Sequence, residues 1–321
     1  MNLAQACTWR RSPVKPELSL CHSSCRKGQR RSARICSRGR SSCRNPHKLS
    51  DCHLSVGCVS ESHQRVGVRH SQVVTSGKGA ATEVSYIADD GEPVTVDFGR
   101  VDADRVVRGR PVRIPVSRAG QRNYSGLYWS STTRAHLVYE SLLERDRLLL
   151  ADFCPAVAWM AAQPFWMRGY DGSTFRRHVP DLLLQHRNGA FTVVDVKPER
   201  MMKKPKVIDV LKWTDRVCRE RGWQYEVWSG TDPTELSNVR FLSLAKRSRF
   251  VDRAASERVS AVTADGMTID QILMTSQDGG VVTRSAAMTA LLEQLWLSRW
   301  ATDLRIPLSG TSAITVGVAA A

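Results

Sequence analysis

Two acidic residues and a lysine interrupt apolar stretches that otherwise have the composition of buried β-strands. Asp181 directly precedes the run 182–184 (LLL), and Asp195 and Lys197 flank Val196 in the segment VVDVK. A charge among apolar neighbours is costly unless it is paired, hydrated or bound to a metal ion. These three side chains are therefore the first candidates for a chemical role.

The loop between the two stretches decides whether the charges meet. A two-residue loop at Asn188-Gly189 would place Asp181 opposite Val196 and turn it away from the other charges, because side chains alternate along a strand. A three-residue loop over 187–189, with glycine in the left-handed conformation, would place Asp181 opposite Asp195, with Lys197 further along the same face. Both loops are open at this stage, and only the second brings the charges together.

The chemistry of such a cluster follows from its charges. Two facing carboxylates repel each other unless a cation lies between them, and an all-oxygen pair suits Mg²⁺, for which we expect Mn²⁺ to substitute. A bound metal can lower the pKa of a water molecule and neutralise charge on a phosphoryl group, and a nearby ammonium adds to this. Metal-dependent phosphodiester hydrolysis is thus one interpretation. The short Asp-x-Lys pattern alone favours another, a solvated sheet face with a weak salt bridge.

The surrounding segments predict an α/β domain that could position these residues. We expect a helix over 134–153, with Glu140 and Glu144 four residues apart on one face. A strand over 157–167 ending at Pro164, the two strands of the charged hairpin, a helix over 206–222 and a strand over 223–229 follow. This order gives a domain of about 120–130 residues, an ordinary size.

The motifs PD…DVK with a preceding helical acid resemble the PD-(D/E)xK restriction-endonuclease-like superfamily. More narrowly, the chain from Arg122 to Gly230 resembles the TnsA-type endonuclease subunit of heteromeric transposases in the segments NYSGLYWSSTTRAHLVYESLLERDRLLLADF, AQPF, PDLLL, VVDVKP and GWQYEVWSG. The likeness continues more weakly through LLEQLWLSRWATDLRIPLS. The resemblance implies a mixed sheet flanked by helices.

The resemblance also implies roles for individual residues. Asp181 would be the central metal ligand, Asp195 a second ligand, Lys197 the catalytic lysine and Glu140 the helical acid that completes the site, with the Val196 carbonyl as a further ligand. From spacing alone, Glu140 is instead a solvated partner of Glu144.

Other polar residues near these motifs have less specific interpretations. Gln163 is either a polar contact of the site or merely the residue before a strand-ending proline. For His178 a phosphate contact is the alternative, and a surface histidine is expected. Lys203, Lys204 and Lys206 precede or begin a predicted helix, where they are candidate DNA-phosphate contacts or a solvated charge run. We expect Trp296 and Trp300 to be core residues, with a partner-docking face as the alternative.

The rest of the chain divides into segments of different character. Of the net charge of +16, residues 1–75 supply +11, from 14 Lys and Arg against three acids, and seven of the nine cysteines lie in the same segment. We interpret residues 1–80 as a basic, disordered extension rather than a zinc module. Residues 81–121 are short strands and loops, 122–235 are the nuclease-like domain, and 236–321 are a mainly helical domain, with a winged helix as one possible form, and a tail.

The composition and the resemblance together predict a function. No basic start is followed by an apolar run, and the most apolar stretch, 148–162, is broken by Asp152 and Pro155, so we expect a cytoplasmic, nucleoid-associated protein without membrane contact. The resemblance implies a Mg²⁺-dependent endonuclease that cuts the 5′ ends of a transposon beside a DDE-type transposase subunit and an AAA+ ATPase regulator. The alternatives are a non-catalytic DNA-binding or assembly subunit and a stand-alone restriction or repair nuclease.

Overall fold

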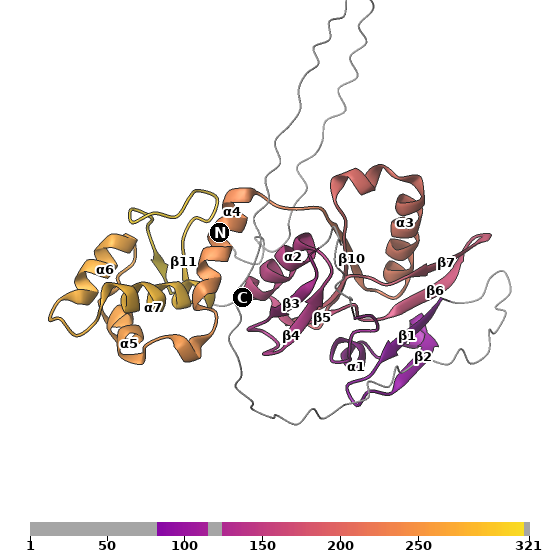
Figure 1. Ribbon diagram of the computed structural model, residues 1–321, viewed down its shortest axis with the longest axis horizontal. Coiled ribbons are helices and arrows are strands. Elements are labelled where there is room, and N and C mark those ends of the chain that lie inside the picture. The colour runs from indigo at the N-terminus through magenta and orange to yellow at the C-terminus, as the bar shows by residue number, and fades with distance from the viewer. Residues whose placement is uncertain (1–81, 115–123, 318–321) are drawn as a thin grey trace, which may run out of the picture. The chain divides into compact units, whose positions relative to one another are not determined.

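The computed structural model describes residues 82–114 and 124–317. These residues form a mixed α/β structure with several sheets and seven α-helices among them (Figure 1). The expected extension over 1–80, with its cysteines and the zinc question, lies outside the described residues, as do residues 115–123. The α/β class expected from the sequence is confirmed.

A four-stranded mixed sheet lies at the centre of the fold, in the order β10-β9-β8-β5. β9 pairs in parallel with β10 and antiparallel with β8, which pairs antiparallel with β5. The strands are β5 (Val157–Ala162), β8 (Leu182–His186), β9 (Phe191–Val196) and β10 (Gln224–Trp228).

Both faces of this sheet are buried along β8 and β9, which explains why the centres of these two strands are apolar. Leu182 and Leu184 belong to the core cluster that contains helix α2 (Leu142–Phe153), whereas Leu183 belongs to the cluster that contains helix α3 (Pro205–Glu220). Figure 1 shows β10 between the two helices. Acidic residues at the ends of β8 and β9 therefore lie in an environment with little water.

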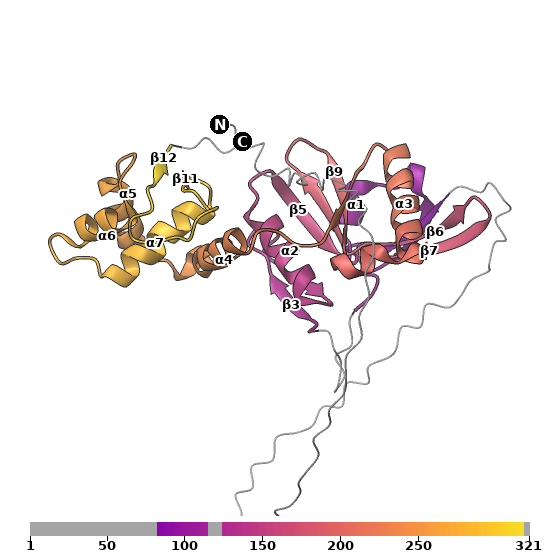
Figure 2. The same cartoon turned by 90° about the horizontal axis from the view of Figure 1, so that it is seen from above.

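A second four-stranded sheet has the order β2-β1-β6-β7. Its strands are β1 (Glu83–Ile87), β2 (Pro93–Asp97), β6 (Trp166–Asp171) and β7 (Thr174–His178), and the short helix α1 (Ala103–Val107) packs with β1 and β2 in one core cluster. The single strand expected over 157–167 is in fact β5 and the start of β6, separated by 163–165. β7 was not expected; it pairs antiparallel with β6 (Figure 2) and ends three residues before Asp181.

The hairpin between β8 and β9 has the three-residue loop. The register runs from Gln185 opposite Phe191 to Leu182 opposite Val194, which places Asp181 opposite Asp195. The amide of His186 donates to the carbonyl oxygen of Ala190 at 2.8 Å, and Gly189 has a φ of 83°. The interpretation that brings the charges together is confirmed.

The helix expected over 134–153 is wrong in its first third. His136–Tyr139 is strand β4, which pairs antiparallel with β3 (Gly126–Trp129). Helix α2 begins only after Ser141, whose hydroxyl oxygen accepts from the amide of Glu144. The Ser-x-x-Glu pattern is a helix-start signal, and it outweighs the apolar periodicity that suggested an earlier start.

Helix α3 and strand β10 agree with the expected helix over 206–222 and strand over 223–229. The 3₁₀ turn η3 (Glu199–Lys203) leads from β9 to α3. Within the expected region of short strands and loops, Arg110 forms an isolated antiparallel bridge with Ile87.

The C-terminal part is mainly helical, as expected. It contains four α-helices and a short antiparallel pair of strands: α4 (Pro233–Leu242), α5 (Arg253–Val262), α6 (Ile269–Gln277), α7 (Arg284–Trp296), β11 (Trp300–Ala301) and β12 (Thr315–Val316). The expected boundary between residues 235 and 236 falls inside α4. Trp296 and Trp300 are both buried, as expected for core residues.

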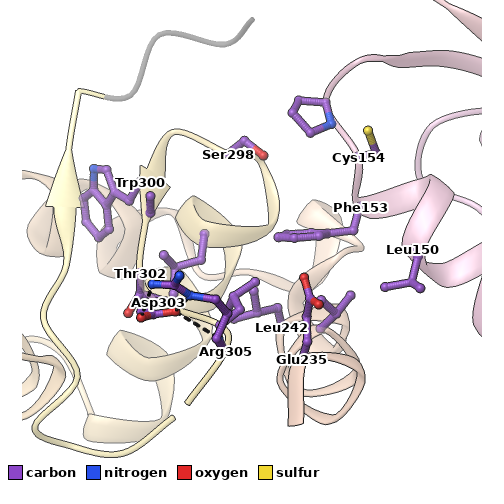
Figure 3. A pocket seen from close by; sticks show the side chains of 15 residues that line it. Leu150, Phe153, Cys154, Glu235, Leu242, Ser298, Trp300, Thr302, Asp303 and Arg305 are labelled. Atoms are coloured by element: carbon purple, nitrogen blue, oxygen red, sulfur yellow. Dashed lines mark hydrogen bonds and ion pairs between the residues drawn. The ribbon is translucent and has the colours of Figure 1, made fainter. Parts of the chain in front are cut away.

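A cavity of about 340 Å³ lies among these elements (Figure 3). It is lined by the end of α2, by α4 and by the chain after α7, and its charged lining residues are Glu235, Asp303 and Arg305. Phe153, which lines it, packs against Trp296 with ring centroids 5.4 Å apart. The cavity is distinct from the charged ends of β8 and β9.

Candidate active site

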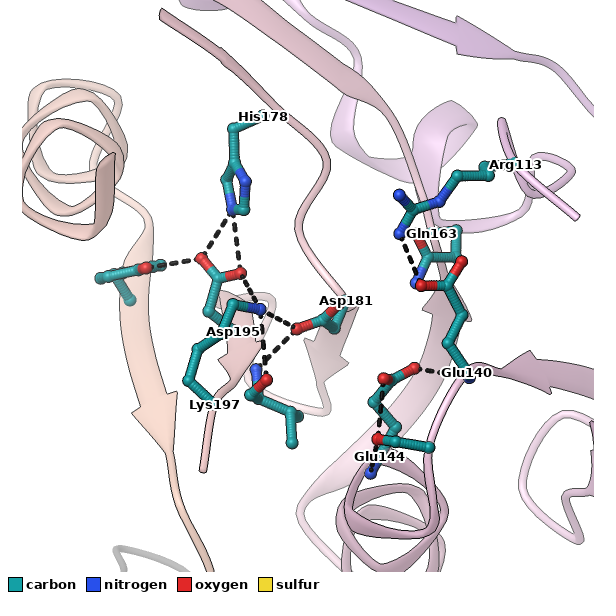
Figure 4. A network of polar contacts seen from close by, with 11 residues as sticks. Arg113, Glu140, Glu144, Gln163, His178, Asp181, Asp195 and Lys197 are labelled. Carbon is teal, nitrogen blue, oxygen red and sulfur yellow. Dashed lines mark hydrogen bonds and ion pairs between the residues drawn. The ribbon is translucent and has the colours of Figure 1, made fainter. Parts of the chain in front are cut away.

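The Lys197 ammonium lies among three oxygen atoms at the ends of β8 and β9. Its Nζ is 2.7 Å from Oδ2 of Asp181, 3.3 Å from Oδ1 of Asp195 and 3.1 Å from the carbonyl oxygen of Val196 (Figure 4). Asp195 is completely buried and Asp181 is 6% exposed. The hairpin register therefore gathers all three expected residues around one positive charge.

Asp195 has further partners on the opposite side of its carboxylate. Nε2 of His178 lies 2.9 and 2.8 Å from its two oxygens, and the Tyr225 hydroxyl donates to Oδ2 at 2.6 Å. Burial by itself would raise the pKa of Asp195, but His178, Lys197 and the Tyr225 hydrogen bond hold that pKa below its ordinary value. Asp195 is thus a stable anion, and His178 is a partner of the site rather than a surface residue.

Asp181 has the opposite tendency. Burial raises its pKa above the ordinary value, and the Asp195 charge adds to this, while Lys197 and the amide of Val196, which donates to Oδ2 at 2.7 Å, act against it. The Lys197 pKa would be lowered by burial, yet the two carboxylates raise it above its ordinary value. Lys197 therefore keeps its full charge.

Glu144 is the acid of helix α2 that interacts with this cluster. It lies in the first helical turn, and burial together with the neighbouring Asp181 charge raises its pKa to about 7. Its carboxylate accepts from the Glu140 amide at 2.8 Å and from the Ser141 hydroxyl at 2.9 Å. A carboxyl group that changes protonation near neutral pH beside a second buried acid is a common feature of catalytic sites.

Glu140 differs from its expected role. It lies between β4 and α2, not on a helix, and its carboxylate forms an ion pair with Arg113 at 2.9 Å. The same Arg113 Nη2 donates to Oε1 of Gln163 at 3.0 Å. Figure 4 shows Arg113, Gln163 and Glu140 grouped on the far side of Asp181 from Lys197. The acid expected on a helix is thus not in a helix, whereas Glu144, four residues further along, lies in the first turn of α2.

The three candidate phosphate contacts lie beyond this cluster. Lys203 ends η3, Lys204 caps α3 and Lys206 is in the first turn of α3, and all three are exposed. Their exposure is compatible with a role in phosphate binding and equally with a solvated charge run. That role stays a prediction.

Sequence reasoning did not assign His178, Tyr225, Arg113 or Glu144 to the site. Tyr225 is 30 residues from Asp195 and Arg113 is 27 residues from Glu140, the acids that they contact, and no local pattern marks either residue. Glu144 did carry a signal, because Ser141-x-x-Glu144 predicts a helix that starts at residue 142.

The donor set around Lys197 fits a hard divalent cation. Two carboxylates and one carbonyl oxygen surround a single positive charge, and oxygen ligands of this kind are those of Mg²⁺ and Mn²⁺. Within residues 82–114 and 124–317, no group of three or more His, Cys, Asp or Glu side chains is arranged to hold a metal ion. Asp181, Asp195 and the Val196 carbonyl would supply the ligands, and Glu144, whose pKa the Asp181 charge raises, is a further acid on a separate element.

Comparisons with known proteins do not narrow the interpretation: no family model and no curated protein sequence matches the chain. Among the described residues, none of the helices has the length and apolar character needed to cross a membrane.

Proposed function

We propose that this chain is a Mg²⁺-dependent DNA endonuclease with a restriction-endonuclease-like core. One observation carries the proposal: the carboxylates of Asp181 and Asp195 and the carbonyl of Val196 surround one cationic atom at the ends of two adjacent buried strands. When bound there, Mg²⁺ would supply Lewis-acid stabilisation and a more acidic water molecule. Mn²⁺ is expected to substitute.

The chain's own residues would have separate tasks. Asp195, held as an anion by His178 and Tyr225, provides a permanent ligand charge. Lys197, which keeps its proton, donates to a phosphate oxygen as negative charge develops there. Glu144, with a pKa of about 7, can accept or release a proton near neutral pH.

The family resemblance specifies the biological setting of the proposal. The substrate would be transposon-end DNA, cut at the 5′ ends, and the partners a DDE-type transposase subunit and an AAA+ ATPase regulator. Such a protein would be cytoplasmic and associated with the nucleoid. Cleavage without these partners would favour a stand-alone restriction or repair nuclease of the same fold.

A second candidate function is a non-catalytic DNA-binding or assembly subunit. It is favoured by the complete burial of Asp195 and by the ion pairs that already neutralise both acids. In that case the carboxylates would be structural, and substitution of Asp181 would leave DNA binding and partner assembly unchanged.

Calorimetric titration with Mn²⁺ separates these functions. The full chain is compared with Asp181→Asn, which keeps the side-chain volume but removes the ligand charge. Saturable binding that is lost in the variant supports the nuclease, and cleavage of transposon-end DNA with the partners present should then be lost in the same variant. Equal heats of Mn²⁺ titration in both proteins, with and without DNA, would favour the non-catalytic binding or assembly subunit.

A further inference from the structure

Gln163 has a backbone conformation that its place at the end of β5 does not require. Its φ is 49°, in the left-handed region that non-glycine residues seldom adopt. Two hydrogen bonds hold it there: its amide donates to the carbonyl oxygen of Asp181 at 2.9 Å, and its own carbonyl accepts from the Val112 amide at 2.9 Å. Strain that the surroundings maintain in this way is concentrated at functional sites, and here it lies directly beside Asp181.

The Gln163 side chain is fully buried and only half of its amide group is paired. Arg113 can only donate, so the atom that faces it at 3.0 Å is Oε1, which fixes the orientation of the amide. Nε2 is therefore the remaining atom, and it is buried without a hydrogen-bond partner in the described part of the chain. A buried donor of this kind requires an explanation, because its desolvation is not compensated.

Arg113 adds charge to the same place. Its Nη2 is shared between Gln163 and Glu140, whereas its Nε and Nη1 make no hydrogen bond to any residue that the structure describes. The Arg113 side chain is 41% exposed. An amide N–H₂ and a guanidinium offer donors only, so the ligand that suits both is an anion with several acceptor oxygens.

We propose that Arg113 and Gln163 form a subsite for a backbone phosphate of the DNA strand, adjacent to Asp181. This inference rests on the proposed nuclease function, which places a phosphodiester at Asp181. Because the Gln163 amide is shielded and Arg113 is exposed, the phosphate meets the guanidinium first and reaches Nε2 as Arg113 turns toward it. The neutral Gln163 amide then positions the phosphate by the geometry of its hydrogen bond, and Arg113 attracts the phosphate by its charge.

Glu140 acts as the internal competitor of this phosphate. Its carboxylate holds Arg113 at 2.9 Å, so the phosphate has to replace an anion that is already present. Glu144, the other acid nearby, is engaged with Ser141 and the Glu140 amide. Removal of the Glu140 charge should therefore strengthen phosphate binding, whereas removal of a metal ligand would not.

The test is a nuclear magnetic resonance titration of the side-chain amide groups in the full chain, without divalent metal and with chelator present. The Gln163 signal is identified by its absence in Gln163→Leu; if that variant does not fold, Gln163→Glu serves the same purpose. Inorganic phosphate is the probe, and chloride at equal ionic strength is the control. Gln185, on neighbouring β8 and paired with Asp104, is the internal reference.

We expect a saturable shift of the Gln163 signal with phosphate but not with chloride, and no shift of Gln185. The apparent affinity should fall about tenfold or more in Arg113→Met and rise several-fold in Glu140→Gln. Equal shifts with phosphate and chloride, or affinities unchanged in both variants, would overturn the subsite. Because metal is absent, a positive result combined with no Mn²⁺ binding at Asp181 would overturn the nuclease proposal and leave the subsite standing.

Discussion

The Lys197 ammonium lies 2.7 Å from the Asp181 carboxylate and also contacts the two other oxygens that would hold a metal ion. The lysine and a divalent cation would therefore share the same oxygen ligands. Without a metal, Lys197 neutralises two buried acids that would otherwise repel each other.

Lys197→Met should separate the structural from the catalytic role of the lysine. In chelator, we expect the free energy of unfolding to fall by on the order of 3 kcal/mol, because two buried carboxylates lose their cation. Added Mn²⁺ should restore part of this loss and bind more tightly than to the wild type, since no ammonium competes. Denaturant unfolding and calorimetry measure both effects. Weaker Mn²⁺ binding in the variant would show that the lysine and the metal do not share these oxygens.

Glu144→Gln should remove a pH dependence of stability. The Glu144 pKa is about 7 in the folded protein against an ordinary value of 4.5, so the folded state binds the proton more tightly. Below about pH 4.5 the Glu144 carboxyl group is protonated in both states and does not lower the free energy of unfolding. As the pH rises through 7 the buried group loses its proton, and the free energy of unfolding falls by on the order of 3 kcal/mol. Urea unfolding in chelator at pH 5 and pH 8.5 should show the wild type losing stability relative to Glu144→Gln at the higher pH. A parallel pH response in the two proteins would contradict the raised pKa.

Glu144 and Glu140 should differ in their effect on metal affinity. Glu144 interacts electrostatically with Asp181, whereas the Glu140 carboxylate is paired with Arg113. We expect Glu144→Gln to weaken Mn²⁺ binding about tenfold and Glu140→Gln to change it less than twofold, in a calorimetric comparison at pH 8. Each variant is the matched control of the other. A larger loss of Mn²⁺ affinity in Glu140→Gln than in Glu144→Gln would indicate that Glu140 is the acid that acts with Asp181 and Asp195.

Gly189→Ala should destabilise the hairpin that brings the charges together. Gly189 has a φ of 83°, and nothing lies within 4 Å of an added Cβ, so the cost is conformational and about 1 kcal/mol. Gly189→Asn should cost less, because asparagine tolerates this conformation. Thermal unfolding measures the difference; equal losses for the two substitutions would argue against a left-handed position.

The sequence by itself identified the charged residues of the candidate site and the two hairpin registers between which the structure decided. Two acids at the ends of apolar runs, a lysine two residues after one of them, and a loop ending in glycine were enough to formulate the register that the structure has. Helix α3 and strand β10 were also predictable, because their periodicity is strong and local.

Tertiary structure decided which side chains complete the site. Helix α2 begins at Leu142, after Glu140 and not before it as expected. Glu144 rather than Glu140 is therefore the acid that interacts with Asp181. His178, Tyr225 and Arg113 come from β7, β10 and the chain after α1, and only the packing of those elements brings them to Asp195 and Gln163. Patterns along the chain specify neighbours a few residues apart, whereas contacts between distant segments depend on how the sheets and helices bury their faces together.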